Sequence, residues 1–208
     1  HKAIEQYYDQ KDPHKAFDEE FKANKIEPLD QKEFEEHQQE GHSLITNFVE
    51  TVPEIHRYYS IVQEGRSEIP FRVWWKDPLT SRLLELPVTG RYDRITSTNQ
   101  VIEIKTSNKP YKQEDIDVAS QASVYLFSRY LETKEIPKDF FYFVFIKGRK
   151  KDSIQVLKTT RTKEEFSQIF QMVDLVLKGV KGGQFNYGTG FMHKFCDCKK
   201  YEKTLLIK

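Results

Sequence analysis

The sequence predicts a mixed α/β (α+β) fold, in which a central mixed β-sheet is flanked by helices and follows a helical N-terminal region. Two observations support this prediction. Residues 1–52 are rich in helix formers, and apolar residues such as Leu44, Ile45 and Phe48 recur near helical spacing. From Tyr58, short segments rich in β-branched and aromatic residues alternate in polarity. The overall order is therefore helices, strands, helix, strands and helix.

The expected elements follow this order along the chain. Pro13 and Pro28 fall where helices start or break, so we expect two or three N-terminal helices. An antiparallel run of strands is expected at residues 58–63, 68–75, 83–95 and 101–107. After it we expect a helix at 115–132, strands at 139–148 and 153–160, and a helix at 163–179.

Composition excludes several classes of protein. Lys and Arg number 33 against 32 Asp and Glu, so a net charge of +1 does not by itself indicate a nucleic-acid binder. Cys196 and Cys198 are too few for a disulfide framework, which suits a reducing cytoplasm. No apolar run reaches membrane-spanning length, and the first residues lack a signal-peptide core. We expect a cytoplasmic protein with no membrane partner, in the host cytoplasm if it is phage-encoded, and native residues upstream of His1.

Charged residues interrupt two expected strands in the stretch GRYDRITSTNQVIEIKTS, residues 90–107. Strand alternation places Glu103 and Lys105 on one face and Ile104 on the other. The polar turn TSTNQ is typical of a hairpin, which would bring Asp93 close to Glu103 across the strand pair. Two carboxylates and one ammonium group are therefore expected to converge.

This convergence predicts metal-assisted hydrolysis of a phosphodiester. Adjacent carboxylates repel each other unless a cation lies between them, and hard oxygen ligands suit magnesium or manganese. Such a cation polarises a phosphoryl oxygen and lowers the pKa of water, while a nearby lysine orients that water or neutralises charge. On spacing alone, an alternative stays open, in which Asp93, Glu103 and Lys105 form surface ion pairs on an exposed sheet face.

Four motifs in sequence order resemble those of the PD-(D/E)xK nuclease superfamily, in particular its RecB-like branch. They are HKAIEQYY with His1, GRYD with Asp93, EIK with Glu103 and Lys105, and QASVY with Gln121 and Tyr125. The resemblance implies a restriction-endonuclease-like core and a single nuclease domain over residues 1–208. Its parts would be a helical wall at 1–55, a catalytic core at 56–178 and a C-terminal tail at 179–208.

The resemblance also implies roles for individual residues. The implied metal ligands are His1, Asp93, Glu103 and the backbone carbonyl of Ile104, with Glu68 as an additional candidate, and the metal would be magnesium or manganese. The implied catalytic residues are Asp93, Glu103, Lys105, Gln121 and Tyr125, with Lys105 serving the attacking water. Alternatives remain for three of them: His1 could be the remnant of a purification tag, Tyr125 a core residue and Gln121 a locally bonded one.

Further candidates lie near the expected cleft or in the tail. Residues that could contact DNA are Lys109, Tyr111, Lys112, Arg149 and Lys150, although a solvated hairpin tip is the alternative for the last two. Trp74 could stack on unpaired bases, but a core position is favoured. Only two cysteines are present, so no iron-sulfur cluster is expected, and with His193 they would make a poor zinc site. The chain has no phosphate-binding P-loop, so helicase activity would belong to a partner.

Together these features predict a metal-dependent deoxyribonuclease. We expect an exonuclease that hydrolyses DNA ends, with a preference for single strands, in recombination, repair or phage DNA processing. DNA is the expected substrate, and a helicase or recombination protein the expected partner. Two alternatives remain: a structure-specific or restriction-type endonuclease, and a non-catalytic nuclease-fold scaffold in a recombination or defence complex.

Overall fold

The computed structural model describes residues 1–24, 30–149 and 153–183. The chain divides into two compact units, His1–Phe170 and Gln171–Lys208. The first unit contains the whole β-sheet and the candidate site, and the assignment of residues 1–208 to a single domain stays a prediction. In the described part of the chain, no helix combines the length and apolar character needed to cross a membrane.

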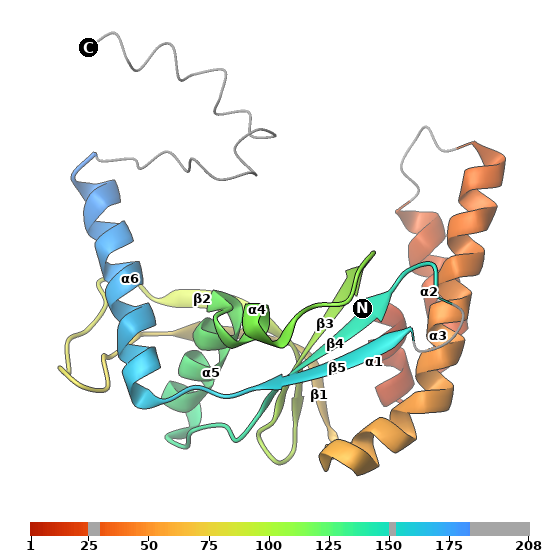
Figure 1. The fold of residues 1–208 in the computed structure, drawn as a ribbon. Coiled ribbons are helices and arrows are strands. Elements are labelled where there is room, and N and C mark those ends of the chain that lie inside the picture. The colour runs from red at the N-terminus through yellow and green to blue at the C-terminus, as the bar shows by residue number, and fades with distance from the viewer. Residues whose placement is uncertain (25–29, 150–152, 184–208) are drawn as a thin grey trace, which may run out of the picture. The chain divides into compact units, whose positions relative to one another are not determined.

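Five strands form one mixed sheet in the order β1-β2-β3-β4-β5 (Figure 1). The elements are α1 (Lys2–Tyr8), α2 (Pro13–Ala23), α3 (Gln31–Tyr59), β1 (Gly65–Val73), β2 (Val88–Thr96), β3 (Val101–Ser107), α4 (Gln113–Asp117), α5 (Ser120–Thr133), β4 (Phe140–Ile146), β5 (Ile154–Thr159) and α6 (Lys163–Lys181). Neighbouring strands are antiparallel except β3 and β4, which are parallel and are joined by the crossover through α4 and α5. The predicted fold class, a mixed sheet flanked by helices, is confirmed.

Three helices form the N-terminal region, as predicted. Asp12 caps α2, because its side chain accepts hydrogen bonds from the N–H groups of His14 and Lys15, and Pro13 occupies the first helical turn. Asp30 caps α3 by accepting from the N–H of Glu33. Pro28 lies outside the described residues.

The strand predicted at residues 58–63 is wrong, because α3 continues to Tyr59. Ser60 ends the helix in a left-handed conformation, with φ of 53°. The aromatic and β-branched residues that suggested a strand instead reach the core from the helix end. The Tyr59 ring lies 5.8 Å from that of Phe141, and Ile61 is buried.

Two further boundaries differ from the predictions. The strand expected at 83–95 begins only at Val88, after an isolated bridge between Lys76 and Leu83.

Trp74 is 56% exposed, so its expected core position is wrong, whereas Trp75 is fully buried and donates to Ser128 Oγ. The strand ends at Val73, so simple alternation no longer decides which tryptophan faces inward.

The helix expected at 115–132 is interrupted. Helix α4 ends at Asp117, and Ala119 is extended, with ψ of 120°, before α5 begins at Ser120. Neither Val118 nor Ala119 is a helix breaker such as glycine or proline, so the sequence around the bend gives no local reason for it.

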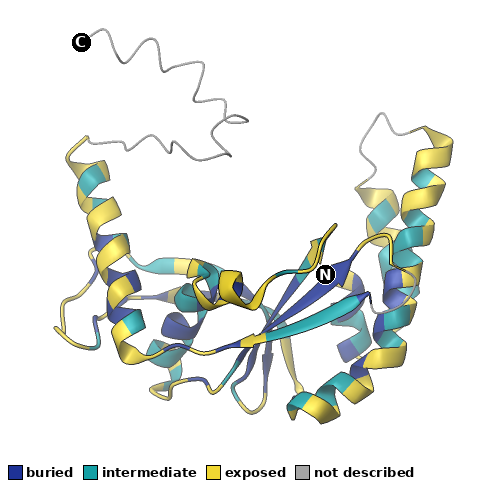
Figure 2. Ribbon diagram, in the orientation of Figure 1, coloured by how far each residue is buried: buried dark blue, intermediate teal, exposed yellow. Residues whose placement is uncertain are grey.

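The sheet is covered on both faces in the first unit. Helices α1 and α3 pack on one face, where Phe48 and Val52 join Ile102, Ile104 and residues of β4 in a buried cluster. Helix α5 covers the other face, and its Phe127 ring lies 4.7 Å from that of Trp75. Figure 2 shows the buried residues gathered along β3 and β4. Strand β3 is the middle strand of the sheet, and Glu103 on it is buried, whereas Lys105 nearer its end is partly exposed.

Replacing Phe48 by alanine should destabilise the fold by about 3–5 kcal/mol, because a fully buried aromatic ring is lost. This ring lies 5.1 Å from that of Tyr7 in α1 and 5.7 Å from that of Phe145 in β4. Tyr58→Ala is the matched control on the same helix, since Tyr58 is 81% exposed. Urea unfolding measures both variants, and equal losses of stability would contradict this account of the core.

Candidate active site

The site begins where β2 and β3 separate. The ladder between them ends at the pair of Arg94 and Ile102. Beyond that pair, Asp93 Oδ2 accepts a hydrogen bond from the backbone N–H of Ile104, at 2.8 Å. The carboxylate thus replaces a strand partner, which fixes its position at the fork between the two strands.

Glu68 reaches the same fork from β1 by way of a strained backbone. The register pairs its neighbours Ser67 and Ile69 with Arg94 and Tyr92, but leaves Glu68 unpaired. Its φ is 52°, in the left-handed region, which costs a non-glycine residue on the order of 1–2 kcal/mol. Strain of this kind inside a strand persists only where the surroundings enforce it, and it is often associated with function.

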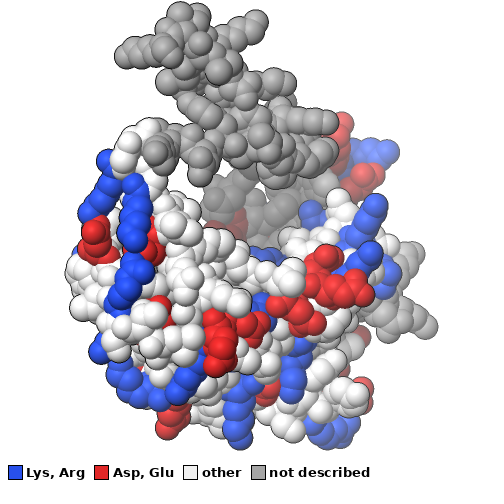
Figure 3. All heavy atoms as spheres, turned by 60° about the vertical axis from the view of Figure 1, so that its left-hand side comes forward, with Lys and Arg blue, Asp and Glu red and all other residues white. Residues whose placement is uncertain are grey.

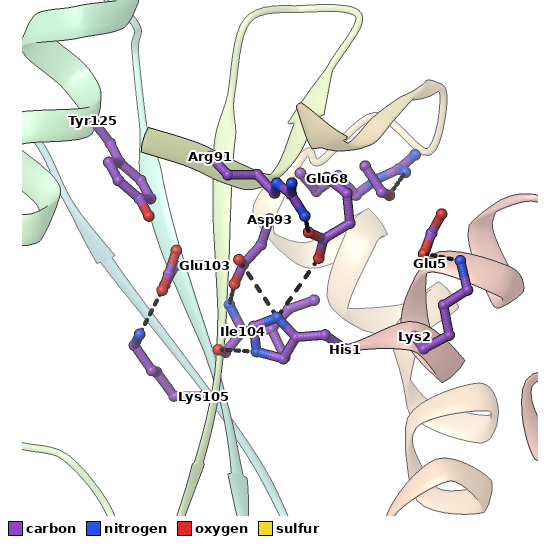
Figure 4. A network of polar contacts seen from close by, with 12 residues as sticks. His1, Lys2, Glu5, Glu68, Arg91, Asp93, Glu103, Ile104, Lys105 and Tyr125 are labelled. Carbon is purple, nitrogen blue, oxygen red and sulfur yellow. Dashed lines mark hydrogen bonds and ion pairs between the residues drawn. The ribbon is translucent and has the colours of Figure 1, made fainter. Parts of the chain in front are cut away.

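His1 completes a cluster of three possible metal ligands. Its Nε2 lies 3.0 Å from the carbonyl oxygen of Ile104, and its Nδ1 lies 3.5 Å from Asp93 Oδ1 and 3.8 Å from Glu68 Oε1. Ligand atoms of His1, Glu68 and Asp93 all lie within 4.8 Å of one another. In Figure 4 the three side chains point toward a common region from the start of α1 and from β1 and β2.

The tautomer of His1 determines whether a lone pair faces Asp93 and Glu68. Nε2 lies at hydrogen-bond distance from the carbonyl oxygen of Ile104, which only accepts, so this contact favours the tautomer with the proton on Nε2. In the neutral ring, the lone pair of Nδ1 then faces two carboxylates. Three electron-rich groups repel one another unless a proton or a cation lies between them.

Glu103 lies beside this cluster but is turned toward α5. Its side chain is 2% exposed, and Oε1 accepts from Lys105 Nζ at 2.5 Å and from Gln121 Nε2 at 2.6 Å. Its other oxygen, Oε2, is buried, and no hydrogen bond reaches it from the residues that the structure describes. A cation shared with Asp93 would satisfy this oxygen; in the metal-free protein, a protonated Glu103 donates a hydrogen bond to Asp93 instead.

The pKa values reflect two acids held close together. Burial raises the pKa of Glu103 to about 7. The hydrogen bonds from Lys105 and Gln121 lower this pKa, and the charge of Asp93 raises it, so the net shift is upward. Burial also raises the pKa of Asp93, despite the N–H of Ile104. For Lys105, burial lowers the pKa, but the hydrogen bond and charge of Glu103 outweigh it, so the net pKa is raised. Lys105 is therefore an ammonium group at neutral pH.

Gln121 and Tyr125 lie on one face of α5, as predicted. Gln121 Nε2 lies 3.4 Å from Tyr125 Oη as well as 2.6 Å from Glu103 Oε1. The ring of Tyr125 packs edge-on against those of Phe71 and Tyr92, with centroids 5.8 Å and 5.3 Å away. Tyr125 thus combines a core ring with a hydroxyl at the site.

Two residues of the GRYD motif have contacts around the site that the sequence did not predict. A Cβ on Gly90 would lie 2.5 Å from the Phe71 ring, so glycine lets this ring cross the strand and support Tyr125. The resemblance had already marked this glycine, three residues before Asp93, as part of the motif. Arg91 Nη1 lies 3.4 Å from Glu68 Oε2, and its place in GRYD, where the residue type is not specified, predicted no role for it.

The described residues predicted to contact DNA lie on two separate loops, after β3 and after β4. Lys109, Tyr111 and Lys112 lie on the loop between β3 and α4, where Tyr111 N–H donates to Gln155 Oε1 of β5. Arg149 is exposed after β4, whereas Lys150 and the tail residues His193, Cys196 and Cys198 lie outside the described residues. On the face in Figure 3, basic and acidic side chains of the described residues are interspersed.

The chain is similar to a known protein family and to solved structures. Residues 1–200 match the family model described as the PD-(D/E)XK nuclease superfamily. No curated protein matches the sequence. A crystal structure of a candidate exonuclease from Eubacterium rectale is 14% identical, covering 96% of this chain and 71% of that chain, with a TM-score of 0.49. The crystal structure of SSO0001 is 16% identical, covering 84% of this chain and 77% of that chain, with a TM-score of 0.40. At these values neither likeness says what this chain does.

Glu68→Gly should leave the free energy of unfolding unchanged or raise it by up to about 1 kcal/mol, because glycine adopts a positive φ without strain. The same change should weaken Mn²⁺ binding, since one carboxylate of the cluster is lost. Glu64→Gly, in the loop just before β1, is a control without a positive φ or a place in the cluster. Urea unfolding and calorimetry test both effects, and a clearly destabilised Glu68→Gly protein would show that the strain is absent.

In the presence of a chelator, stability should fall as pH rises from about 5 to 8. The folded state holds a proton on Glu103 up to a pKa of about 7, against a usual value of 4.5, so it binds more protons than the unfolded chain in this window. The expected loss, relative to Glu103→Gln, is on the order of 2 kcal/mol. Urea unfolding of both proteins at the two pH values measures it, and parallel pH profiles would contradict the raised pKa.

Proposed function

Because this chain belongs to the PD-(D/E)XK nuclease superfamily, we propose that it is a metal-dependent deoxyribonuclease of the RecB-like branch. One observation carries the proposal. His1, Glu68 and Asp93 bring their ligand atoms within 4.8 Å of one another, and His1 also reaches the carbonyl of Ile104. The buried Glu103, bonded to the partly exposed Lys105, lies beside this cluster. This arrangement joins a site for a cation to a positive hydrogen-bond donor, which is what hydrolysis of a phosphodiester requires.

The donor atoms fit a hard divalent cation, and members of the superfamily generally use divalent metal ions. Carboxylate and carbonyl oxygens with one imidazole nitrogen suit Mg²⁺ or Mn²⁺. The residues that would hold the ion are His1, Asp93, Glu103 and Ile104 through its carbonyl, with Glu68 as a further ligand. When bound, such an ion polarises a phosphoryl oxygen and lowers the pKa of water.

Lys105 serves as a positive donor rather than as a base. Its raised pKa keeps three N–H donors on Nζ at neutral pH, one of which binds Glu103 Oε1. The other donors can orient a water or neutralise charge that develops on the phosphate. Glu103 fixes the position of Nζ, and Gln121 fixes the orientation of Glu103. The hydroxyl of Tyr125 extends this chain of polar groups beyond Gln121.

We propose DNA ends as the substrate, with exonuclease action and a preference for single strands. The exposed Lys109, Lys112 and Arg149, with Lys150, would contact phosphates, and Tyr111 would stack on a base. A helicase or recombination protein would supply the strand in recombination, repair or phage DNA processing.

A cleavage assay tests this function. Wild-type protein with Mg²⁺ or Mn²⁺ should degrade linear single-stranded DNA and leave single-stranded circles intact. Lys105→Gln should lower the rate about 10²–10³-fold, as expected for the loss of one preorganised donor. Lys158→Gln is the matched control, because its ion pair with Asp139 lies outside the cluster.

Each other outcome identifies an alternative. Cleavage of circles would replace exonuclease by endonuclease action. A wild-type protein that cleaves no DNA with either metal would overturn the enzymatic proposal and leave a nuclease-fold scaffold.

A further inference from the structure

The bend between α4 and α5 determines where Gln121 points, yet nothing in its own sequence causes it. Val118 and Ala119 separate the helices, and Ala119 is extended, with ψ of 120°. Helix α5 has no side-chain cap at its start, and the segment contains neither glycine nor proline. A single continuous helix is the conformation that the local sequence favours.

A distant side chain, Arg161, holds this bend. It follows β5 and is 5% exposed. Its Nε donates to Ser123 Oγ at 2.8 Å. Its Nη1 donates to Thr159 Oγ1 at 2.6 Å and to Thr160 O at 2.7 Å. Its Nη2 donates to Ile116 O at 3.0 Å and to Ala119 O at 3.1 Å. Nε also lies 3.9 Å from Glu165 Oε1.

These contacts use all five N–H donors of the guanidinium group. Two of the acceptors are the carbonyl at the end of α4 and the carbonyl just before α5, and a third lies in the first turn of α5. The planar guanidinium group therefore bridges both sides of the bend and connects them to the end of β5. A lysine at this position keeps the charge, but its single ammonium group cannot reach acceptors spread over such a plane.

We propose that Arg161 is a positioning residue for the metal site and acts through Gln121. Gln121 lies in the turn of α5 that Arg161 holds, and its Nε2 orients the Glu103 carboxylate through a 2.6 Å hydrogen bond. A straightened helix would turn Gln121 away from Glu103. Residues that orient a metal ligand commonly affect metal affinity about 10–100-fold. This inference rests on the proposed function, because it takes Glu103 as a metal ligand.

Calorimetry with Mn²⁺ tests the inference on wild type, Arg161→Lys, Gln121→Ala and the double variant. Each single change should weaken Mn²⁺ binding about tenfold, and the double variant should bind no more weakly than Gln121→Ala. Effects that multiply in the double variant would overturn the proposal, as would wild-type affinity in a folded Arg161→Lys protein. Single-turnover cleavage rates should follow the same pattern.

Controls separate positioning from general loss of stability. Val52→Ala removes buried volume from α3 on the opposite face of the sheet, so it should lower stability without changing Mn²⁺ affinity. If Arg161→Lys does not fold, Thr159→Val, which removes one acceptor of Nη1, should show a smaller loss of affinity in the same direction. Unchanged affinity in a folded Thr159→Val protein would then count against the proposal.

A second measurement does not depend on metal. The side-chain amide of Gln121 gives its own NMR signal, which should move to the position of a free amide in Arg161→Lys and stay in place in Val52→Ala. An unmoved signal in Arg161→Lys would overturn the positioning role. A wild-type protein that binds no Mn²⁺ would overturn the proposed function instead, and the NMR result would still decide what Arg161 does.

Discussion

A single hydrogen bond, from the N–H of Ile104 to the carboxylate of Asp93, organises the site. It closes the fork between β2 and β3 with a side chain instead of a strand. The Ile104 side chain is buried against α1 and α3, while its carbonyl meets His1 at the start of α1. The neighbouring residue Glu103 faces α5 on the other side. One stretch of β3 thus places a carbonyl and a carboxylate beside Asp93, and the helices on both faces of the sheet supply their partners.

This arrangement works against stability in the metal-free protein. Two partly buried acids with raised pKa values, a carboxylate oxygen without a donor and a strained Glu68 all lie within one small region. A fold selected for stability alone has no physical reason to keep them together, since each costs free energy that a cation would recover. Beside the site, the rings of Phe71, Tyr92 and Tyr125 pack against one another.

Much of this could be predicted from the sequence. Periodicity located the mixed sheet and the helical N-terminal region, and four motifs pointed to the superfamily that the family model confirms. Non-local causes account for the errors. The bend at Ala119 depends on Arg161, some forty residues away, and the end of α3 depends on Tyr59 packing against β4. The positive φ of Glu68 has no local signature either, because glutamate normally avoids that conformation.

The central claim is that Asp93 and Glu103 share one divalent cation. Crystals grown with Mn²⁺ and measured for anomalous scattering test it most directly. The account predicts one peak at coordination distance from an oxygen of each carboxylate and from the carbonyl oxygen of Ile104. A peak held only by His1, Glu68 and Asp93, with no oxygen of Glu103 at coordination distance, would contradict the claim, as would the absence of any peak.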